Sequence, residues 1–178
     1  MNAAFVERLA AAEIGATFNF YREGEGASVR CERLAAYLEE RAGAAWILVG
    51  EAAGYRGARV SGIPFTSERQ LTGSAPGEST ATIVHRVLAE LRVLEHVLLW
   101  NLVPTHPHAA GNAATNRAPT KAEIAAARPF LGELADGRRV IPVGRLAQAE
   151  LGGAYVRHPS HGGAAAFRAG LLEYGLGN

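Results

Sequence analysis

The stretch Ala44-Ala45-Trp46-Ile47-Leu48-Val49 runs directly into Gly50-Glu51-Ala52-Ala53-Gly54. A short apolar run bounded by turn residues is typical of a strand that is buried on both faces of a parallel sheet. Residues 97–100 and 154–156 form two further apolar runs, and each is followed by a polar loop that contains proline or glycine. Ligands bind at the carboxyl ends of the strands in open α/β sheets. The three loops are therefore expected to bring a carboxylate, an amide and an imidazole to one edge of the sheet.

The composition is that of a globular protein with one domain, residues 1–178. Hydrophobic residues make up 48% of the chain and charged residues 20%, and no apolar run approaches the ~20 residues of a membrane span. The first residues lack the basic start and the apolar core of a signal peptide. The single cysteine, Cys31, excludes an internal disulfide and any four-cysteine metal or cluster site. We therefore expect a reducing, cytoplasmic location (nucleoid-associated in a prokaryote) and no membrane contact.

Positive charge is concentrated in the three loop regions. Residues 50–69 carry a net charge of +1, and residues 101–121 and 157–168 carry +2 each, whereas the whole chain carries +1. The unopposed charges of the last two regions are Arg117, Lys121, Arg157 and Arg168. A basic edge suits a docked polyanion. The alternative is that arginine-rich loops reflect a composition with seventeen arginines and one lysine.

Strands alternate with helices along the chain, which implies a parallel sheet with helices on both faces. The patterns predict helices at 7–12, 32–41, 80–92, 119–134, 146–151 and 164–174, and strands at 44–49, 97–100, 140–143 and 154–156. Ser67 with Gln70, and Thr120 with Glu123, have the spacing of capping boxes at helix starts. The segment from the first strand to about Phe65 is predicted to be a long loop.

Glu51 is the candidate catalytic carboxylate. The only aspartate, Asp136, lies in an Asp-Gly turn between a helix and a strand, and Glu68 is explained by the start of a helix. Glu51 directly follows a buried strand inside a glycine turn, where a carboxylate can orient a water or stabilise a developing cation. The alternative is an ordinary solvated loop glutamate.

Asn101 and Phe65 are candidate ligand-binding residues. Asn101 follows Trp100 at the predicted end of the second strand. Its amide offers one acceptor and one donor in a fixed fork, which matches an imide edge such as uracil N3–H and O4. The alternative role for Asn101 is to tie two loops together. Phe65 follows Pro64 in a loop rich in glycine and serine, where it either stacks on a ligand or plugs the core.

His158-Pro159-Ser160 ends the fourth predicted strand. The rigid proline holds the imidazole at the strand end, and Ser160 can hydrogen-bond to a phosphate. His106 and His108 lie on either side of a proline, but no third ligand motif accompanies them, so no metal site is expected. The chain also lacks the Gly-x-x-x-x-Gly-Lys, Gly-x-Gly-x-x-Gly and Gly-x-Ser-x-Gly motifs, which removes common ATPase, dinucleotide-binding and hydrolase interpretations.

In their order and spacing, these motifs resemble the uracil-DNA glycosylase superfamily from about Trp46 to the C-terminal helix. Residues 50–54 resemble the water-activating loop of its iron–sulfur branch, and Ile63-Pro64-Phe65-Thr66 resembles the stacking segment that follows. Trp100-Asn101-Leu102-Val103 resembles the strand end that reads the base, and His158-Pro159-Ser160 the motif before the loop that penetrates the duplex. Residues 116–120, 127–131 and 141–145 resemble the loop, the helix and the strand that lie between these two motifs in the family.

The resemblance implies a three-layer α/β/α domain with a four-stranded parallel sheet, and a pocket for a base that is flipped out of DNA. It implies that Glu51 handles the attacking water and that His158 donates to uracil O2. It also implies that Asn101 pairs with the imide edge and that Phe65 stacks on the base. The remaining implied residues are Gly50 and Ala52 for the uracil, and Arg117, Lys121, Arg157, Ser160, His161 and Gly162 for the DNA.

The chain departs from the family pattern at several positions. The cysteines that bind the cluster of the iron–sulfur branch are missing, so packing must supply the stability that they give. Ala53 replaces a common proline, and Gly54 stands where another branch has a tyrosine that excludes the thymine methyl group. The histidine-containing insertion of the branch that links covalently to DNA is not recognisable, although His106 and His108 lie in the same loop region.

These observations predict a monofunctional glycosylase that hydrolyses the N-glycosidic bond of deoxyuridine in DNA. Water is the nucleophile, so no cofactor is expected, and the partner is uracil-containing DNA, single- or double-stranded, bound by a monomer. The first alternative is a non-catalytic protein of the same fold that binds or traps uracil or abasic DNA. The second is an α/β hydrolase or transferase that acts on a free nucleoside or nucleotide, which the basic edge disfavours.

Overall fold

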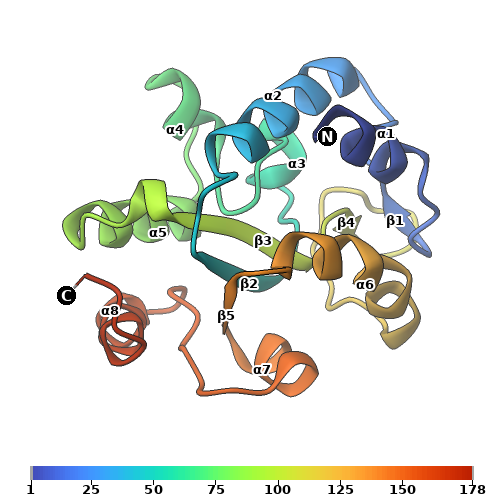
Figure 1. Ribbon diagram of the computed structural model, residues 1–178. Helices are drawn as coiled ribbons and strands as arrows, with labels where there is room; N and C mark the ends of the chain where they lie inside the picture. The colour runs from blue at the N-terminus through green and yellow to red at the C-terminus, as the bar shows by residue number, and fades with distance from the viewer. Residues whose placement is uncertain (1, 178) are drawn as a thin grey trace.

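A computed structural model describes residues 2–177 and shows a parallel sheet between layers of helices (Figure 1). The central strand is β2 (Trp46–Ala52), with β3 (Val97–Val103) on one side and β5 (Arg139–Pro142) on the other. Both pairings are parallel, and Gly50 lies opposite Asn101 in the β2–β3 register. The carboxyl ends of β2 and β3 therefore meet at the same edge of the sheet.

The apolar runs form strands because both faces of the sheet are covered. Every residue of β3 is buried, and Trp100 at its centre is fully buried with its ring edge-on to Phe5 at 5.8 Å. The helices α1 (Asn2–Ala11) and α2 (Ala27–Glu40) lie above the sheet in Figure 1, and α7 (Arg145–Leu151) and α8 (Ala164–Glu173) lie below it. This confirms the mixed α/β class with helices on both faces of a parallel sheet.

The remaining elements connect these layers. They are α3 (Ala58–Ser61), α4 (Glu68–Thr72), α5 (Ser79–Glu90), the 3-10 turn η1 (Leu94–His96), α6 (Lys121–Ala135), and the short antiparallel strands β1 (Thr17–Phe18) and β4 (His106–Pro107). Both predicted capping boxes are present, at the starts of α4 and α6. In residues 2–177, no helix combines the length and the apolar character that a membrane crossing requires.

The expected fourth strand is wrong. Residues 154–156 approach β5 only through a single parallel bridge between Val143 and Val156, so the sheet has three strands. Gly152 and Gly153, both with positive φ (73° and 82°), turn the chain just before this segment. Pro159 follows soon after and has no backbone N–H to donate to a ladder. Val156 is nevertheless fully buried beside β5, so the polar loop after it still starts at the edge of the sheet.

Two boundaries differ in a way that affects the site. The strands β2 and β3 each extend three residues beyond the predicted ends, so Glu51 and Asn101 belong to strands rather than to the loops after them. The segment before Phe65 is not one long loop, because residues 58–61 form the short helix α3. Strand pairing holds the backbone of both polar residues in place, which a free loop would not do.

Candidate active site

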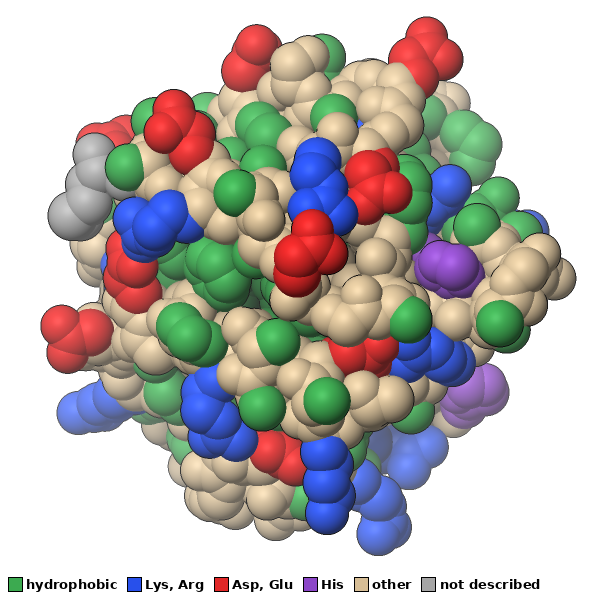
Figure 2. Space-filling model, turned by 90° about the vertical axis from the view of Figure 1, so that its right-hand side faces the viewer, with side chains coloured by type: hydrophobic (Ala, Val, Ile, Leu, Met, Phe, Trp, Pro, Cys, Tyr) green, Lys and Arg blue, Asp and Glu red, His purple; other side chains and the backbone are tan. Residues whose placement is uncertain are grey.

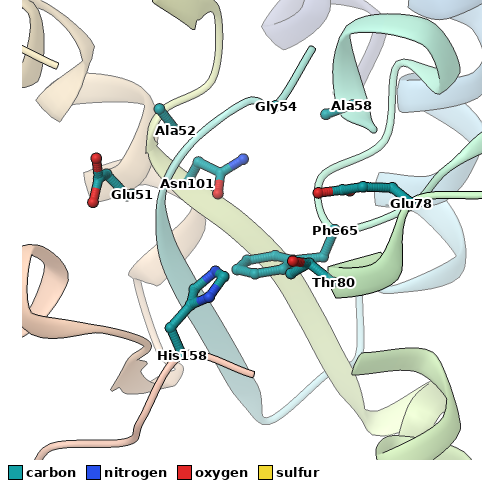
Figure 3. A pocket seen from close by; sticks show the side chains of 9 residues that line it. All are labelled: Glu51, Ala52, Gly54, Ala58, Phe65, Glu78, Thr80, Asn101 and His158. Carbon is teal, nitrogen blue, oxygen red and sulfur yellow. The ribbon is translucent and has the colours of Figure 1, made fainter. Parts of the chain in front are cut away.

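A pocket of about 90 Å³ opens at the carboxyl ends of β2 and β3. Its lining comes from the ends of both strands, from the segments after β2, and from the loop that precedes α8 (Figure 3): Glu51, Ala52, Gly54, Ala58, Phe65, Glu78, Thr80, Asn101 and His158. A drug-sized ligand needs several hundred Å³, so this pocket suits a single small ring. The structure therefore brings together the carboxylate, the amide and the imidazole of the three predicted loops.

Gly50 leaves the space that the side chains of Phe65 and Asn101 occupy beside this pocket. A Cβ atom at this position would lie 2.8 Å from Phe65 Cε2 and 2.9 Å from Asn101 Oδ1, closer than real Cβ contacts. Phe65 itself has a φ of 52°, a left-handed conformation that is uncommon for a bulky residue. Such strain persists where the surrounding structure holds it, and it clusters at functional sites. The Phe65 ring is thus held against the strand in a fixed place.

Asn101 presents its amide to the pocket. The residue is only 3% exposed and lines the pocket, and none of the side-chain hydrogen bonds within residues 2–177 involves its amide. A buried amide without protein partners is costly unless a ligand or water completes it. The alternative role of tying two loops together gains no support, because no loop of the described chain bonds to this amide.

His158 is positioned so that one ring nitrogen is left for a ligand. The Ser160 backbone N–H donates to His158 Nδ1 at 3.3 Å, and the Ser160 hydroxyl lies 2.8 Å from the same nitrogen. Since Nδ1 accepts a hydrogen bond, the proton of the neutral ring is on Nε2. Burial, helped by the nearby His161, lowers the pKa of His158 and favours this neutral form. The ring points toward Phe65, with the two ring centres 6.5 Å apart (Figure 3).

Glu51 lies at the mouth of the pocket. Its side chain is exposed, and in Figure 3 its carboxylate lies on the side of the pocket opposite Glu78. Glu51 also lines an adjoining groove, so its carboxylate faces the boundary between the two spaces. Partial burial raises the pKa of Glu51, and no cationic side chain contributes to the shift. A carboxylate in this place can hold a water against a ligand in the pocket.

The residue that sequence reasoning missed is Glu78. It stands just before α5, where an acidic residue normally only favours the helix start. Its carboxylate instead reaches into the pocket from the wall that faces Glu51 (Figure 3). Burial raises the pKa of Glu78 as well. No motif in the sequence marks it, because only the path of the chain between α4 and α5 brings it to the site.

The adjoining groove is much larger, about 690 Å³. It runs from Glu51 and His158 along the loop after β5, past Ser160 and His161, to Tyr155. Tyr155 is 38% exposed, and the Arg145 guanidinium lies 5.9 Å from its ring centre. An exposed aromatic ring and cationic side chains beside a groove suit a nucleic-acid strand.

The predicted basic edge needs one correction. Arg117 is not unopposed, because its guanidinium forms a two-pronged ion pair with Glu123 at 2.6 and 2.8 Å. Glu123 is almost completely buried, and this pair holds its pKa down at about 2. The charge count over residues 101–121 missed the pairing, because it ended before Glu123, which was assigned only to the capping box that it also forms. Arg117 is therefore tied into the fold.

The other predicted cations are exposed. Lys121 and Arg157 have no carboxylate partner within residues 2–177, and Gly162 lies with them at the surface. On the face that carries α6, positive and negative side chains are interspersed, and positive ones gather toward its lower edge (Figure 2). The positive character of the site edge is thus local rather than spread over the molecule.

The histidines of the β4 segment are part of the framework of the loop. His106 is fully buried, with Nδ1 2.9 Å from the Ala53 carbonyl, so it links β4 to the loop after β2. The His108 ring stacks on it with centres 5.8 Å apart. Across residues 2–177, no three side chains of histidine, cysteine, aspartate or glutamate gather as metal ligands would.

Comparison with known proteins identifies the family and the fold of the chain. The family model of the uracil DNA glycosylase superfamily matches residues 39–171, so the chain belongs to that superfamily. No curated protein matches the sequence. The crystal structure of wild-type SMUG2 from Pedobacter heparinus is similar, with a TM-score of 0.67, 14% identity, and coverage of 97% of this chain and 96% of that one. At this identity the likeness shows a shared fold.

Proposed function

We propose that the protein is a monofunctional DNA glycosylase that hydrolyses the N-glycosidic bond of deoxyuridine and releases uracil. The observation that carries this proposal is the pairing of the open Asn101 amide with the neutral, Nε2-protonated ring of His158 across one small pocket. An amide fork and an imidazole N–H complement the imide edge and the O2 atom of a uracil ring. Phe65 supplies the surface on which that ring stacks.

The reaction needs charge stabilisation at two points. As the glycosidic bond breaks, the sugar becomes cationic and the leaving base becomes anionic. His158 donates to O2 as negative charge grows there, and Glu51 at the pocket mouth faces the sugar and the attacking water. Preorganised groups of this kind are each worth roughly 10²- to 10⁴-fold in rate. Water is the nucleophile in this scheme, so the proposal requires no cofactor.

DNA binds along the groove beside the pocket. Ser160 and His161 line this groove and contact the strand where the base leaves the duplex. The exposed Lys121 and Arg157 neutralise phosphates, and the exposed Gly162 contacts the strand beside His161. A flipped base costs a few kcal/mol of lost stacking and pairing, and least at a mismatched or unpaired base. The proposal puts the sugar of the flipped nucleotide at the pocket mouth, and the position of the groove next to Glu51 supports this.

One observation favours the non-catalytic alternative, a protein that binds or traps uracil or abasic DNA. Glu51 is exposed, and its carboxylate turns away from Asn101 in Figure 3, so the water it would hold is not enclosed. Incubation of the purified protein with a uracil-containing oligonucleotide separates the two functions. Release of free uracil, with an abasic strand that breaks in alkali, supports the glycosylase. Tight binding with no released uracil supports the trap, and indifference to competing duplex DNA would instead favour an enzyme of free nucleosides.

A further inference from the structure

Tyr155 is an exposed aromatic residue that the proposed reaction does not use. It lies in the segment between α7 and α8, is 38% exposed, and does not belong to the hydrophobic core. The ring lines the same groove as Glu51 and His158, but it does not line the base pocket. Its place in the molecule is therefore explained neither by core packing nor by contact with the flipped base.

The backbone on both sides of Tyr155 is fixed by hydrogen bonds. The Tyr174 hydroxyl donates to the Ala154 carbonyl at 2.7 Å, and the Gly144 N–H donates to the Val156 carbonyl at 2.8 Å. Val156 is fully buried, and successive side chains of extended backbone point to opposite sides, so the Tyr155 ring points away from the core. A ring that is held outward on a fixed backbone loses little conformational freedom when a ligand stacks on it.

A cation accompanies the ring. The Arg145 guanidinium at the start of α7 lies 5.9 Å from the centre of the Tyr155 ring. Arg145 is exposed and forms no ion pair within residues 2–177, and Glu150 on the same helix pairs with Arg128 at 3.1 Å instead. Aromatic rings and positive charges along one groove are the combination with which proteins bind single-stranded nucleic acid.

The groove connects this pair of residues to the base pocket, and this step depends on the proposed function. With the sugar of the flipped nucleotide beside Glu51, the same strand continues along the groove past His158 and Ser160 to Tyr155. The strand therefore brings an unpaired nucleotide, close in sequence to the flipped one, to the exposed ring.

We propose that Tyr155 and Arg145 form a second nucleobase site, in which Tyr155 stacks on an unpaired base of the strand that carries the flipped nucleotide and Arg145 binds the phosphate of that base. Every nucleobase has a face that can stack, so this site adds affinity without selecting the neighbouring sequence. It lies on one side of the flipped nucleotide only, because the groove leads to Tyr155 in one direction.

The test measures the affinity for single-stranded oligonucleotides that contain a 2′-fluoro-deoxyuridine, which resists cleavage, and that are shortened one nucleotide at a time from either end. Removal of one particular nucleotide, on one side, should weaken binding to the wild-type protein by about 5- to 100-fold, the value of one stacked base. Tyr155→Leu should abolish this step, and Tyr155→Phe, which keeps the ring, should retain it. Leu71→Ala, 39% exposed on α4, is the control and should also retain it.

Arg145 is tested by the salt dependence of the same binding. Arg145→Gln should reduce the dependence of log affinity on log salt by about 0.7, the share of one phosphate on a single strand. If the wild-type protein shows no such step, or if Tyr155→Leu keeps it, the second nucleobase site is wrong, while release of uracil from the full-length oligonucleotide still supports the glycosylase. If the wild-type protein binds these oligonucleotides but releases no uracil, a step that depends on Tyr155 supports the site although the glycosylase fails.

Discussion

Gly50 on β2 lies opposite Asn101 on β3, and the Asn101 side chain can occupy its position because Gly50 has no side chain. A Cβ atom at Gly50 would lie 2.9 Å from Asn101 Oδ1 and would also overlap the Phe65 ring. The sheet register thus couples a glycine on the central strand to the amide that we assign to base recognition. The Phe65 ring and the Asn101 amide can both pack against the central strand because Gly50 carries no side chain at this step of the register.

Gly50→Ala is predicted to damage the site more than the fold. The added methyl group must displace Phe65 or Asn101, and overpacking of this kind costs about 1–3 kcal/mol of stability. We expect a folded protein by circular dichroism, with single-turnover excision of uracil reduced by about 100-fold because the two contacts shift together. Gly43→Ala is the matched control, since nothing lies within 4 Å of a Cβ there. Equal activity of the two variants would show that Gly50 does not shape the pocket.

Asn101→Asp is predicted to change which base is accepted. The substitution replaces an amide donor with an oxygen, so uracil O4 faces a repelling atom while the amino group of cytosine gains a partner. Loss of an oriented hydrogen bond in a polar site costs up to about 10⁴-fold in discrimination. Rates on uracil- and cytosine-containing oligonucleotides measure the change, with exposed Asn112→Asp as the control. Unchanged excision of uracil would remove Asn101 from the base pocket.

Substitutions of Arg117 and Lys121 are predicted to have different effects, the first on the stability of the fold and the second on DNA binding. Arg117→Gln leaves buried Glu123 without its cation, which should lower the free energy of unfolding by about 3 kcal/mol. Lys121→Gln should leave stability unchanged and reduce the dependence of log affinity on log salt by about 1, the share of one phosphate. Denaturant unfolding and salt titrations of DNA binding give both values. If Arg117→Gln changes the salt dependence of DNA affinity and Lys121→Gln does not, the prediction that Lys121 contacts a phosphate is wrong.

Much of this fold could be predicted from local patterns in the sequence. The apolar run before Gly50 forms the central strand, and Thr120 with Glu123 forms the expected capping box. These features depend on residues close in sequence, so the pattern alone indicates them. The placement of Asn101 beside the pocket follows from the same logic, because parallel strands end at one edge.

The features that sequence could not predict depend on the three-dimensional path of the chain. The pairing of β1 with β4 joins segments about ninety residues apart. Arg117 and Glu123 are only six residues apart, but their ion pair depends on how the chain enters α6, so Arg117 was counted as unopposed. Residues 154–156 do not form a fourth strand because Gly152 and Gly153, both with positive φ, turn the chain just before them. The segment does not lack apolar residues. Glu78 reaches the pocket only because the loop between two helices folds back over Gly57.

Stability is predicted to fall as the pH drops below about 6.5. Burial is the main cause that lowers the pKa of His85, His106 and His158 from the ordinary value of 6.5. The unfolded chain therefore takes up protons first, and the stability present above pH 6.5 is lost as the pH falls from that value through the lower pKa values of the folded state. The raised carboxyl pKa values of Glu51 and Glu78 have the opposite effect, because protonation of these groups adds stability as the pH falls through values above the ordinary 4.5.

Urea unfolding at a series of pH values between 5 and 8 measures this slope. His106→Gln should reduce it, because one buried histidine no longer titrates, and exposed His96→Gln should not. A profile that is flat from pH 7 to pH 5.5 in the wild-type protein would contradict the prediction.

The last prediction assigns the chemistry to Glu51 and His158. Each stabilises a different charge, Glu51 on the side of the sugar and water and His158 on the side of uracil O2, so each should contribute roughly 10²- to 10⁴-fold. Glu51→Gln and His158→Ala should fold, still bind uracil-containing DNA, and release uracil more slowly by that factor in single-turnover assays. Glu95→Gln and His96→Gln are matched controls on the exposed η1 turn. Full activity in both site variants would leave the enzyme standing but discard this assignment, whereas loss of binding in His158→Ala would make that residue a binding group.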